Sequence, residues 1–71
     1  MATKYFPESS NVISISHKGK TMTVVFRETG KYEYYGVPEY MYNEAVKAES
    51  IGHWVYQHLV KGKFKFKKVN Q

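Results

Sequence analysis

Apolar and polar residues alternate along the chain between residues 12 and 35, and two glycines, Gly19 and Gly30, interrupt the alternation. A period of two residues is typical of a β-strand that buries one face. Three strands are therefore predicted, at residues 12–17, 21–27 and 31–35. Because tight turns join them, we expect an antiparallel β-meander of three strands.

The turns also predict a register. A two-residue loop at Lys18-Gly19 pairs Ile15 with Met22 and Ile13 with Val24. A three-residue loop at residues 28–30, with Gly30 in the left-handed region, pairs Phe26 with Tyr32 and Val24 with Tyr34. Both loops place the apolar residues of neighbouring strands on the same face, as a half-buried sheet requires.

Helical patterns follow the meander. Pro38 suits the first position of a helix, which is predicted over residues 38–48 with Met41, Ala45 and Ala48 on one face. Ser50 is a suitable cap for a second helix. The apolar face of this helix has helical spacing and consists of Ile51, Trp54, Val55, His58 and Leu59.

The last element alternates strictly between lysine and phenylalanine over residues 63–67, which predicts a strand whose Phe64 and Phe66 pack inward. The element order is then β-β-β-α-α-β. Two short helices that pack on one face of an antiparallel sheet define an α+β fold.

The chain has 71 residues, which we interpret as one domain over residues 1–71, with residues 1–9 as an irregular lead-in. There is no cysteine, so the 17% of aromatic residues must supply the dense core. No segment has the length of a membrane span or of a signal-peptide apolar run. We therefore expect a soluble cytoplasmic protein with no membrane partner.

The formal net charge of +5 arises entirely from the C-terminal end. Six basic and six acidic residues cancel over residues 1–60, and residues 61–71 add five lysines and no acid. A neutral body with a basic end attracts anionic partners. The sequence thus favours a binding module for nucleic acid, RNA or another single strand, with these candidate residues: Arg27, Lys31, Tyr35, Lys61, Lys63, Lys65, Lys67 and Lys68.

A structural explanation of the same lysines is equally consistent with the pattern, because lysines on an edge strand prevent edge-to-edge aggregation. The alternative function is that of a protein–protein adaptor, or of a phage-encoded inhibitor of a host protein. Its anchors would be Tyr40, Tyr42 or Trp54, since tyrosine and tryptophan are frequent interface hot spots. The oligomeric state stays open.

Catalysis, metal binding and cofactors are not expected. The chain has no aspartate and no cysteine, and its serines lack the context of a catalytic nucleophile. His53 and His58 are five residues apart on a predicted helix, so they do not share a face as an i, i+4 metal pair would. His58 is interpreted as a histidine at the edge of the core.

Three sequence segments resemble one known family. They are Glu8-Ser9-Ser10-Asn11-Val12, then residues 30–38 (GKYEYYGVP) followed by Met41-Tyr42, and finally Ala48-x-Ser50-x-Gly52 before an aromatic-bearing helix. The chain is similar over nearly its whole length to the KTSC domain. This short module occurs at the C-terminus of some lysyl-tRNA synthetases and as a free-standing protein of bacteria and phages. The resemblance implies a small α+β domain and a connection to RNA.

The chain departs from the family pattern in the second helix. The family usually carries an asparagine and basic residues there, whereas this chain has Tyr56, Gln57 and His58. Val60 looks like an extra residue before Lys61.

Overall fold

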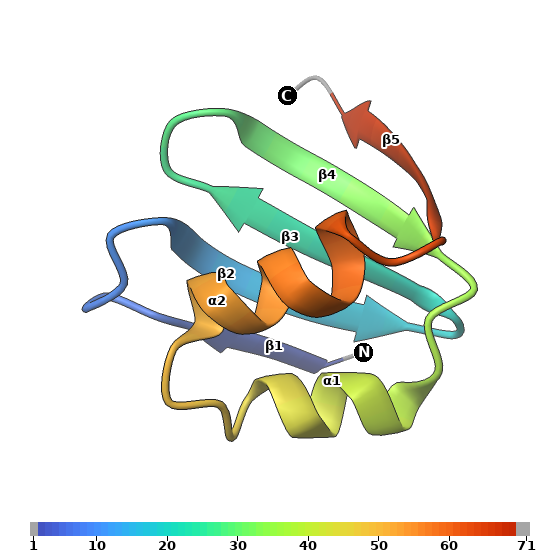
Figure 1. Cartoon of the computed structure of the whole chain (residues 1–71), viewed down its shortest axis with the longest axis horizontal. Helices are drawn as coiled ribbons and strands as arrows, with labels where there is room; N and C mark the ends of the chain where they lie inside the picture. Colours follow the sequence, from blue (N-terminus) through green and yellow to red (C-terminus); the bar gives the residue numbers. More distant parts are fainter. Residues whose placement is uncertain (1, 70–71) are drawn as a thin grey trace.

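Five antiparallel strands form one sheet, in front of which the helices lie (Figure 1). The computed structural model describes residues 2–69. The strands are β1 (Ala2–Tyr5), β2 (Val12–Lys18), β3 (Thr21–Phe26), β4 (Gly30–Tyr35) and β5 (Lys65–Val69), in the spatial order β1-β2-β3-β4-β5. The α+β class holds, but the predicted three-stranded meander is wrong, because β1 and β5 extend the sheet on its two sides.

Strand β1 lies within the segment that was expected to be an irregular lead-in. It pairs antiparallel with β2, with Lys4 opposite Ile15. All four of its side chains are exposed. A strand that is held by backbone pairing and buries neither face has no alternation of apolar and polar residues, so its sequence carries no strand signal.

Both predicted hairpin registers are shifted by two residues. Ile15 lies opposite Val24, and the β2–β3 turn is Gly19-Lys20. Gly19 has φ +64°, and the type II′ turn requires its glycine at the first loop position, which explains the shift. The β3–β4 loop has the predicted three residues but occupies residues 27–29, so that Phe26 lies opposite Gly30. A shift by two keeps every side chain on its face, so the apolar face was predicted correctly from Ile15 to Tyr34.

A β-bulge near the start of β2 changes which residues face the core. The register shifts between Val12 and Ser14. Val12 and Ile15 are completely buried, whereas Ile13 is half-buried. The extra residue at a bulge reverses the inward and outward positions that precede it. The expectation that Ile13 and Ile15 share the core face is therefore wrong at Ile13.

The first helix is shorter than predicted, and the second changes to a π-helical turn part-way along. Helix α1 spans Glu39–Ala45 and α2 spans Ile51–Val55, followed directly by a π-helical turn, η1 (Tyr56–Val60). Pro38 precedes α1 in an extended conformation. The Ser50 hydroxyl accepts a hydrogen bond from the His53 amide at 3.3 Å, so the predicted cap is present. In η1, the Lys61 amide donates to the Tyr56 carbonyl oxygen, five residues earlier, at 2.9 Å.

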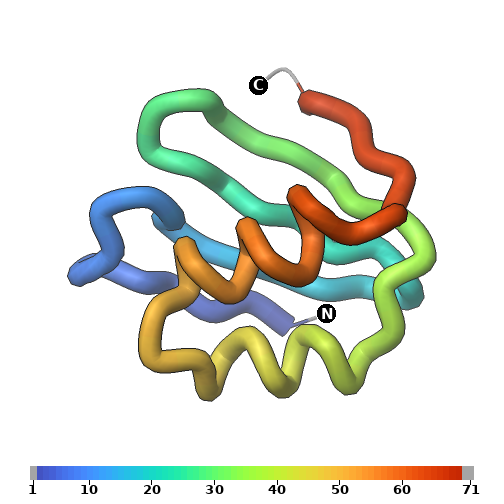
Figure 2. Tube along the Cα trace, viewed as in Figure 1, coloured from blue at the N-terminus to red at the C-terminus, as the bar shows by residue number. Residues whose placement is uncertain are grey.

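The core lies between the helices and the sheet. It consists of Val12, Ile15, Met22, Val24, Tyr34, Val37, Met41, Tyr42, Ala45, Ile51, Trp54, Val55 and Leu59. Strand β5 returns beside β4 although the helices separate the two strands in sequence (Figure 2). Within residues 2–69, no helix is long and apolar enough to cross a lipid bilayer.

Candidate nucleic-acid interface

The pairing of β4 with β5 assigns each C-terminal side chain to a face of the sheet. Partners in an antiparallel pair project to the same side. Tyr34 is buried and lies opposite Phe66, so these two residues are on the helix-covered face. Tyr35 and Glu33 project to the other side, together with their partners Lys65 and Lys67. This side of the sheet, which faces away from the helices, is named the open face.

The open face continues across the sheet through β3 and β2. Thr23 lies opposite Glu33 on one side and opposite Ser16 on the other. Lys18, at the end of β2, is exposed and lies opposite Thr21. A shallow hollow of about 320 Å³ on this face is lined by residues of β2, β3 and β4, Tyr35 among them. The face thus combines hydroxyl groups, lysines and two aromatic residues, because Tyr5 of β1, opposite Ser14, also projects to this side.

Tyr35 is oriented by its acidic neighbour. Its hydroxyl donates a hydrogen bond to Glu33 Oε1 at 2.8 Å. This hydrogen bond, with burial and the charge of Glu33, raises the pKa of the Tyr35 hydroxyl above its ordinary value. The hydroxyl therefore stays protonated at neutral pH. The ring, with 37% of its residue surface exposed, is held in place on the open face.

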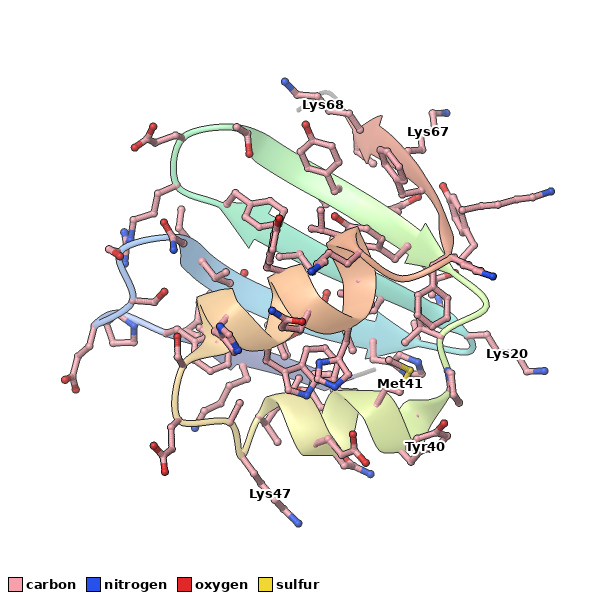
Figure 3. All side chains as sticks on the ribbon, viewed as in Figure 1. Lys20, Tyr40, Met41, Lys47, Lys67 and Lys68 are labelled. Carbon is pink, nitrogen blue, oxygen red and sulfur yellow. The ribbon has the colours of Figure 1, made fainter. Side chains whose placement is uncertain are left out.

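The five C-terminal lysines do not form a single surface. Lys65 and Lys67 are on the open face, whereas Lys68 is opposite Tyr32 on the helix-covered face, with its Nζ 6.0 Å from the centre of the Tyr32 ring. Figure 3 shows Lys67 and Lys68 leaving β5 in different directions. Lys61 directly follows η1, with its Nζ 5.7 Å from the Tyr56 ring centre, and Lys63 is exposed in the segment between η1 and β5.

Arg27 does not join the lysines. Its Nε donates to the Ser9 carbonyl oxygen at 2.7 Å, and its Nη2 donates to the carbonyl oxygens of Pro7 at 3.2 Å and Phe6 at 3.4 Å. The guanidinium therefore holds the turn between β1 and β2. These contacts support a role for Arg27 in stabilising the fold, and its role as a phosphate contact stays a prediction.

The three candidate anchors of a protein interface are placed differently. Tyr40 on α1 is 62% exposed, whereas Tyr42 and Trp54 are buried in the core. Trp54 stacks on the His58 ring at 4.4 Å between ring centres. The sequence pattern did not identify Tyr5, Tyr56 and Phe66 as exposed aromatic residues; Phe66 was expected to pack inward but is 61% exposed. Strand β5 lies beyond the part of the sheet that the helices cover, and no local pattern reveals that.

Two of the three histidine side chains, those of His17 and His58, are within hydrogen-bond distance of backbone carbonyl groups. His17 is buried, with its Nε2 2.7 Å from the Val37 carbonyl oxygen. His58 Nδ1 is 2.9 Å from the Trp54 carbonyl oxygen. Among residues 2–69 there is no group of three or more histidine, aspartate or glutamate side chains that could hold a metal ion.

Two of the segments that carry the family resemblance meet in space. Residues 8–11 and 48–52 line the same hollow of about 550 Å³. The Ser9 hydroxyl accepts hydrogen bonds from the amides of Asn11 and Val12, at 3.2 and 3.1 Å, which shapes the turn. A Cβ at Gly52 would lie 2.9 Å from Asn11 Nδ2, so the glycine lets the two segments approach closely.

The chain is similar to known proteins. The family model of the KTSC domain matches residues 8–64. The chain belongs to the KTSC domain family. A crystal structure of a KTSC domain protein from Yersinia pestis is 33% identical to this KTSC domain, with a TM-score of 0.81. The match covers 97% of this chain and 100% of the Yersinia chain. A search of curated proteins found no match.

Proposed function

We propose that this KTSC domain is a non-enzymatic module that binds single-stranded nucleic acid, RNA in particular, on the open face of its sheet. The observation that carries the proposal is the β4–β5 register, which brings Lys65 and Lys67 beside Lys31 and Tyr35. These side chains come from segments that are far apart in the sequence. Their assembly on a face that the helices leave uncovered supports a binding role (Figure 1).

The charges of the open face suit a phosphate backbone. Lys18, Lys31, Lys65 and Lys67 supply four positive charges, and Glu33 supplies one negative charge that is hydrogen-bonded to Tyr35. Lysines that neutralise phosphates release counterions, so affinity falls as salt rises. Four such contacts to a single strand correspond to a slope of about −3 in a plot of log K against log salt.

Tyr35 provides a sequence-independent contact. Aromatic rings on open sheets stack on unpaired bases. Every base has a flat face, so this stacking does not depend on the nucleotide sequence. The hydrogen bond to Glu33 fixes the ring before a ligand arrives, which lowers the entropy cost of binding. The expected ligand is therefore a single strand with little base preference.

A charge-matched pair of variants tests the proposal. Lys65→Gln/Lys67→Gln removes two charges from the open face. Lys4→Gln/Lys47→Gln removes two exposed charges elsewhere, from β1 and from the segment after α1. With fluorescently labelled octauridylate, we expect the first variant to weaken binding and to reduce the salt slope by about 1.4, and the second to change both only slightly. Equal losses in the two variants would contradict the proposal.

The alternative function, that of a protein–protein adaptor or of an inhibitor of a host protein, has less support. Of its three candidate anchors, Tyr42 and Trp54 are buried, and an interface would have to rely on Tyr40.

A further inference from the structure

A second surface lies on the other face of β5, on the helix-covered side of the sheet. On the helix-covered side of β4 and β5, beyond the end of η1, a hollow of about 340 Å³ is lined by aromatic and other mainly apolar side chains: Phe26, Thr29, Tyr32, Tyr34, Val60 and Phe66. Two of these side chains, Phe66 and Val60, are 61% and 50% exposed. The hollow is named the aromatic hollow below.

The rings of the aromatic hollow hold one another in place. Tyr32 lies edge-on to Phe26 with ring centres 5.6 Å apart and an interplanar angle of 82°. Phe66 contacts Tyr34 and Tyr32, with ring centres 5.7 and 6.1 Å apart. A ring that is supported by two neighbours and still exposed presents a fixed flat surface to a ligand.

The surroundings of the aromatic hollow are cationic. Lys68 extends from β5 on the same face, with its Nζ 6.0 Å from the Tyr32 ring centre. Lys65 and Lys67 lie on the other face of the same strand. Since β5 is the last strand of the sheet, a ligand that passes over its outer edge can reach both faces.

The chemistry of β5 suits a nucleic acid. Each nucleotide carries one anionic phosphate and one flat base, and β5 has one aromatic ring, Phe66, with lysines on both sides of it in the sequence. A peptide segment would supply apolar groups, but it has no anion at every repeat. The charge therefore favours a polyanion with aromatic rings as the occupant, and a volume of about 340 Å³ is within the range of small-molecule pockets.

We propose that the aromatic hollow is a base-binding site, in which one unpaired base of the bound strand stacks on Phe66 while its flanking phosphates contact Lys65, Lys67 and Lys68. This inference rests on the proposed function, and it adds a second face to it. The strand runs over the outer edge of β5 and engages both sides of the sheet.

Two octamers separate the contribution of the bases to binding from that of the phosphates. Octauridylate and an abasic ribose-phosphate octamer carry the same phosphates, but only the first has bases. Stacking on Tyr35 and on Phe66 should make octauridylate bind the wild-type domain about twentyfold more tightly than the abasic octamer. Phe66→Leu should weaken octauridylate binding about fivefold, because the contact with Tyr35 remains, and leave binding of the abasic octamer unchanged.

Tyr40→Leu is the matched control, because Tyr40 is 62% exposed and lies on α1, away from β5. It should bind both octamers as the wild type does. In addition, intermolecular nuclear Overhauser contacts between uracil protons and the Phe66 ring should be visible in the wild-type complex, a readout that needs no variant.

The outcomes distinguish the two proposals. If neither octamer binds, the proposed function itself fails. If both octamers bind equally well, or if Phe66→Leu and Tyr40→Leu weaken octauridylate binding equally, the base site is refuted and the lysine surface stands. Binding without contacts between uracil and Phe66 also overturns the base site.

Discussion

Arg27 carries a positive charge, but its guanidinium is directed at backbone carbonyl groups of the turn between β1 and β2. Arg27→Lys keeps the net charge and loses the fork that reaches several oxygens. We expect the free energy of unfolding to fall by about 1–2 kcal/mol, as measured by urea unfolding followed by Trp54 fluorescence. The affinity for octauridylate should not change. A variant with weaker binding and unchanged stability would show that Arg27 contacts the ligand.

The burial of two tyrosine hydroxyl groups predicts that the domain loses stability at alkaline pH. Burial raises the pKa of the Tyr34 hydroxyl, with a smaller effect from Tyr32, and burial also raises the pKa of Tyr42. The unfolded chain ionises first, near the ordinary value of 10.0. This contribution to stability is therefore fully present below about pH 10 and is lost as pH rises through the higher pKa values of the folded state.

Thermal unfolding at a series of pH values between 8 and 11 measures this effect. Tyr34→Phe/Tyr42→Phe should lose stability less steeply above pH 10 than the wild type, while the exposed Tyr40→Phe should follow the wild type. A double variant with the same steep loss as the wild type would assign the alkaline limit to other groups.

At the scale of elements, the π-helical turn η1 depends on Gly62. A Cβ at Gly62 would collide with the His58 carbonyl oxygen, which belongs to the backbone and cannot move aside freely. Gly62→Ala should therefore lower the free energy of unfolding by about 3 kcal/mol. Gly52→Ala is the control. Its Cβ would lie 2.9 Å from Asn11 Nδ2 and 3.3 Å from Asn11 Cβ, so the Asn11 side chain must shift, but no backbone atom is in the way and alanine favours a helix; we expect a loss of only about 1 kcal/mol.

Urea unfolding of the two glycine variants checks this contrast. If both variants have similar stability, the clash at Gly62 is relieved at low cost, and η1 is not a fixed element.

Strand β1 should be the least protected strand of the sheet. It lies at an edge with four exposed residues, whereas β3 is central and buries Met22 and Val24. The backbone opens locally, and its amide hydrogens exchange, where few apolar contacts hold it in place. We expect the amides of β1 to exchange more than about a hundredfold faster than those of β3 in NMR hydrogen exchange. Equal protection would mean that β1 is part of the cooperative core.

These elements show what the sequence could predict. The alternation of apolar and polar residues predicted β2, β3 and β4, and the helical spacing of apolar residues predicted α1 and α2. Each of these elements buries one face against the core, and this burial produces the pattern. Nothing local distinguished β1, which buries no face, or the bulge after Val12, which depends on how β2 meets β3. The extra residue noticed at Val60 coincides with η1, and a π turn is one way for a helix to hold an added residue.

For the whole molecule, the position of the charge matters more than its sum. The formal charge of +5 identified the C-terminal end as the candidate interface. Which of its lysines act together depends on the pairing of β5 with β4, which divides Lys65 and Lys67 from Lys68. The sequence could not predict this division, since it follows from a register between segments far apart in the chain.

The edge-strand explanation of the same lysines also belongs to this scale. Lysines on β5 would prevent edge-to-edge association whether or not they bind a ligand. If Lys65→Gln/Lys67→Gln forms dimers in sedimentation while its affinity for octauridylate is that of the wild type, the lysines serve solubility and the proposed function fails. We expect the variant to lose affinity.

The most direct test of the central claim is an NMR titration of labelled protein with octauridylate, first at low salt and then at about 0.15 M salt. We expect amide shifts at Lys31, Tyr35, Lys65 and Lys67 that weaken as salt rises, with no shifts along α1. The absence of shifts even at low salt, or shifts confined to α1 around Tyr40, would contradict the claim.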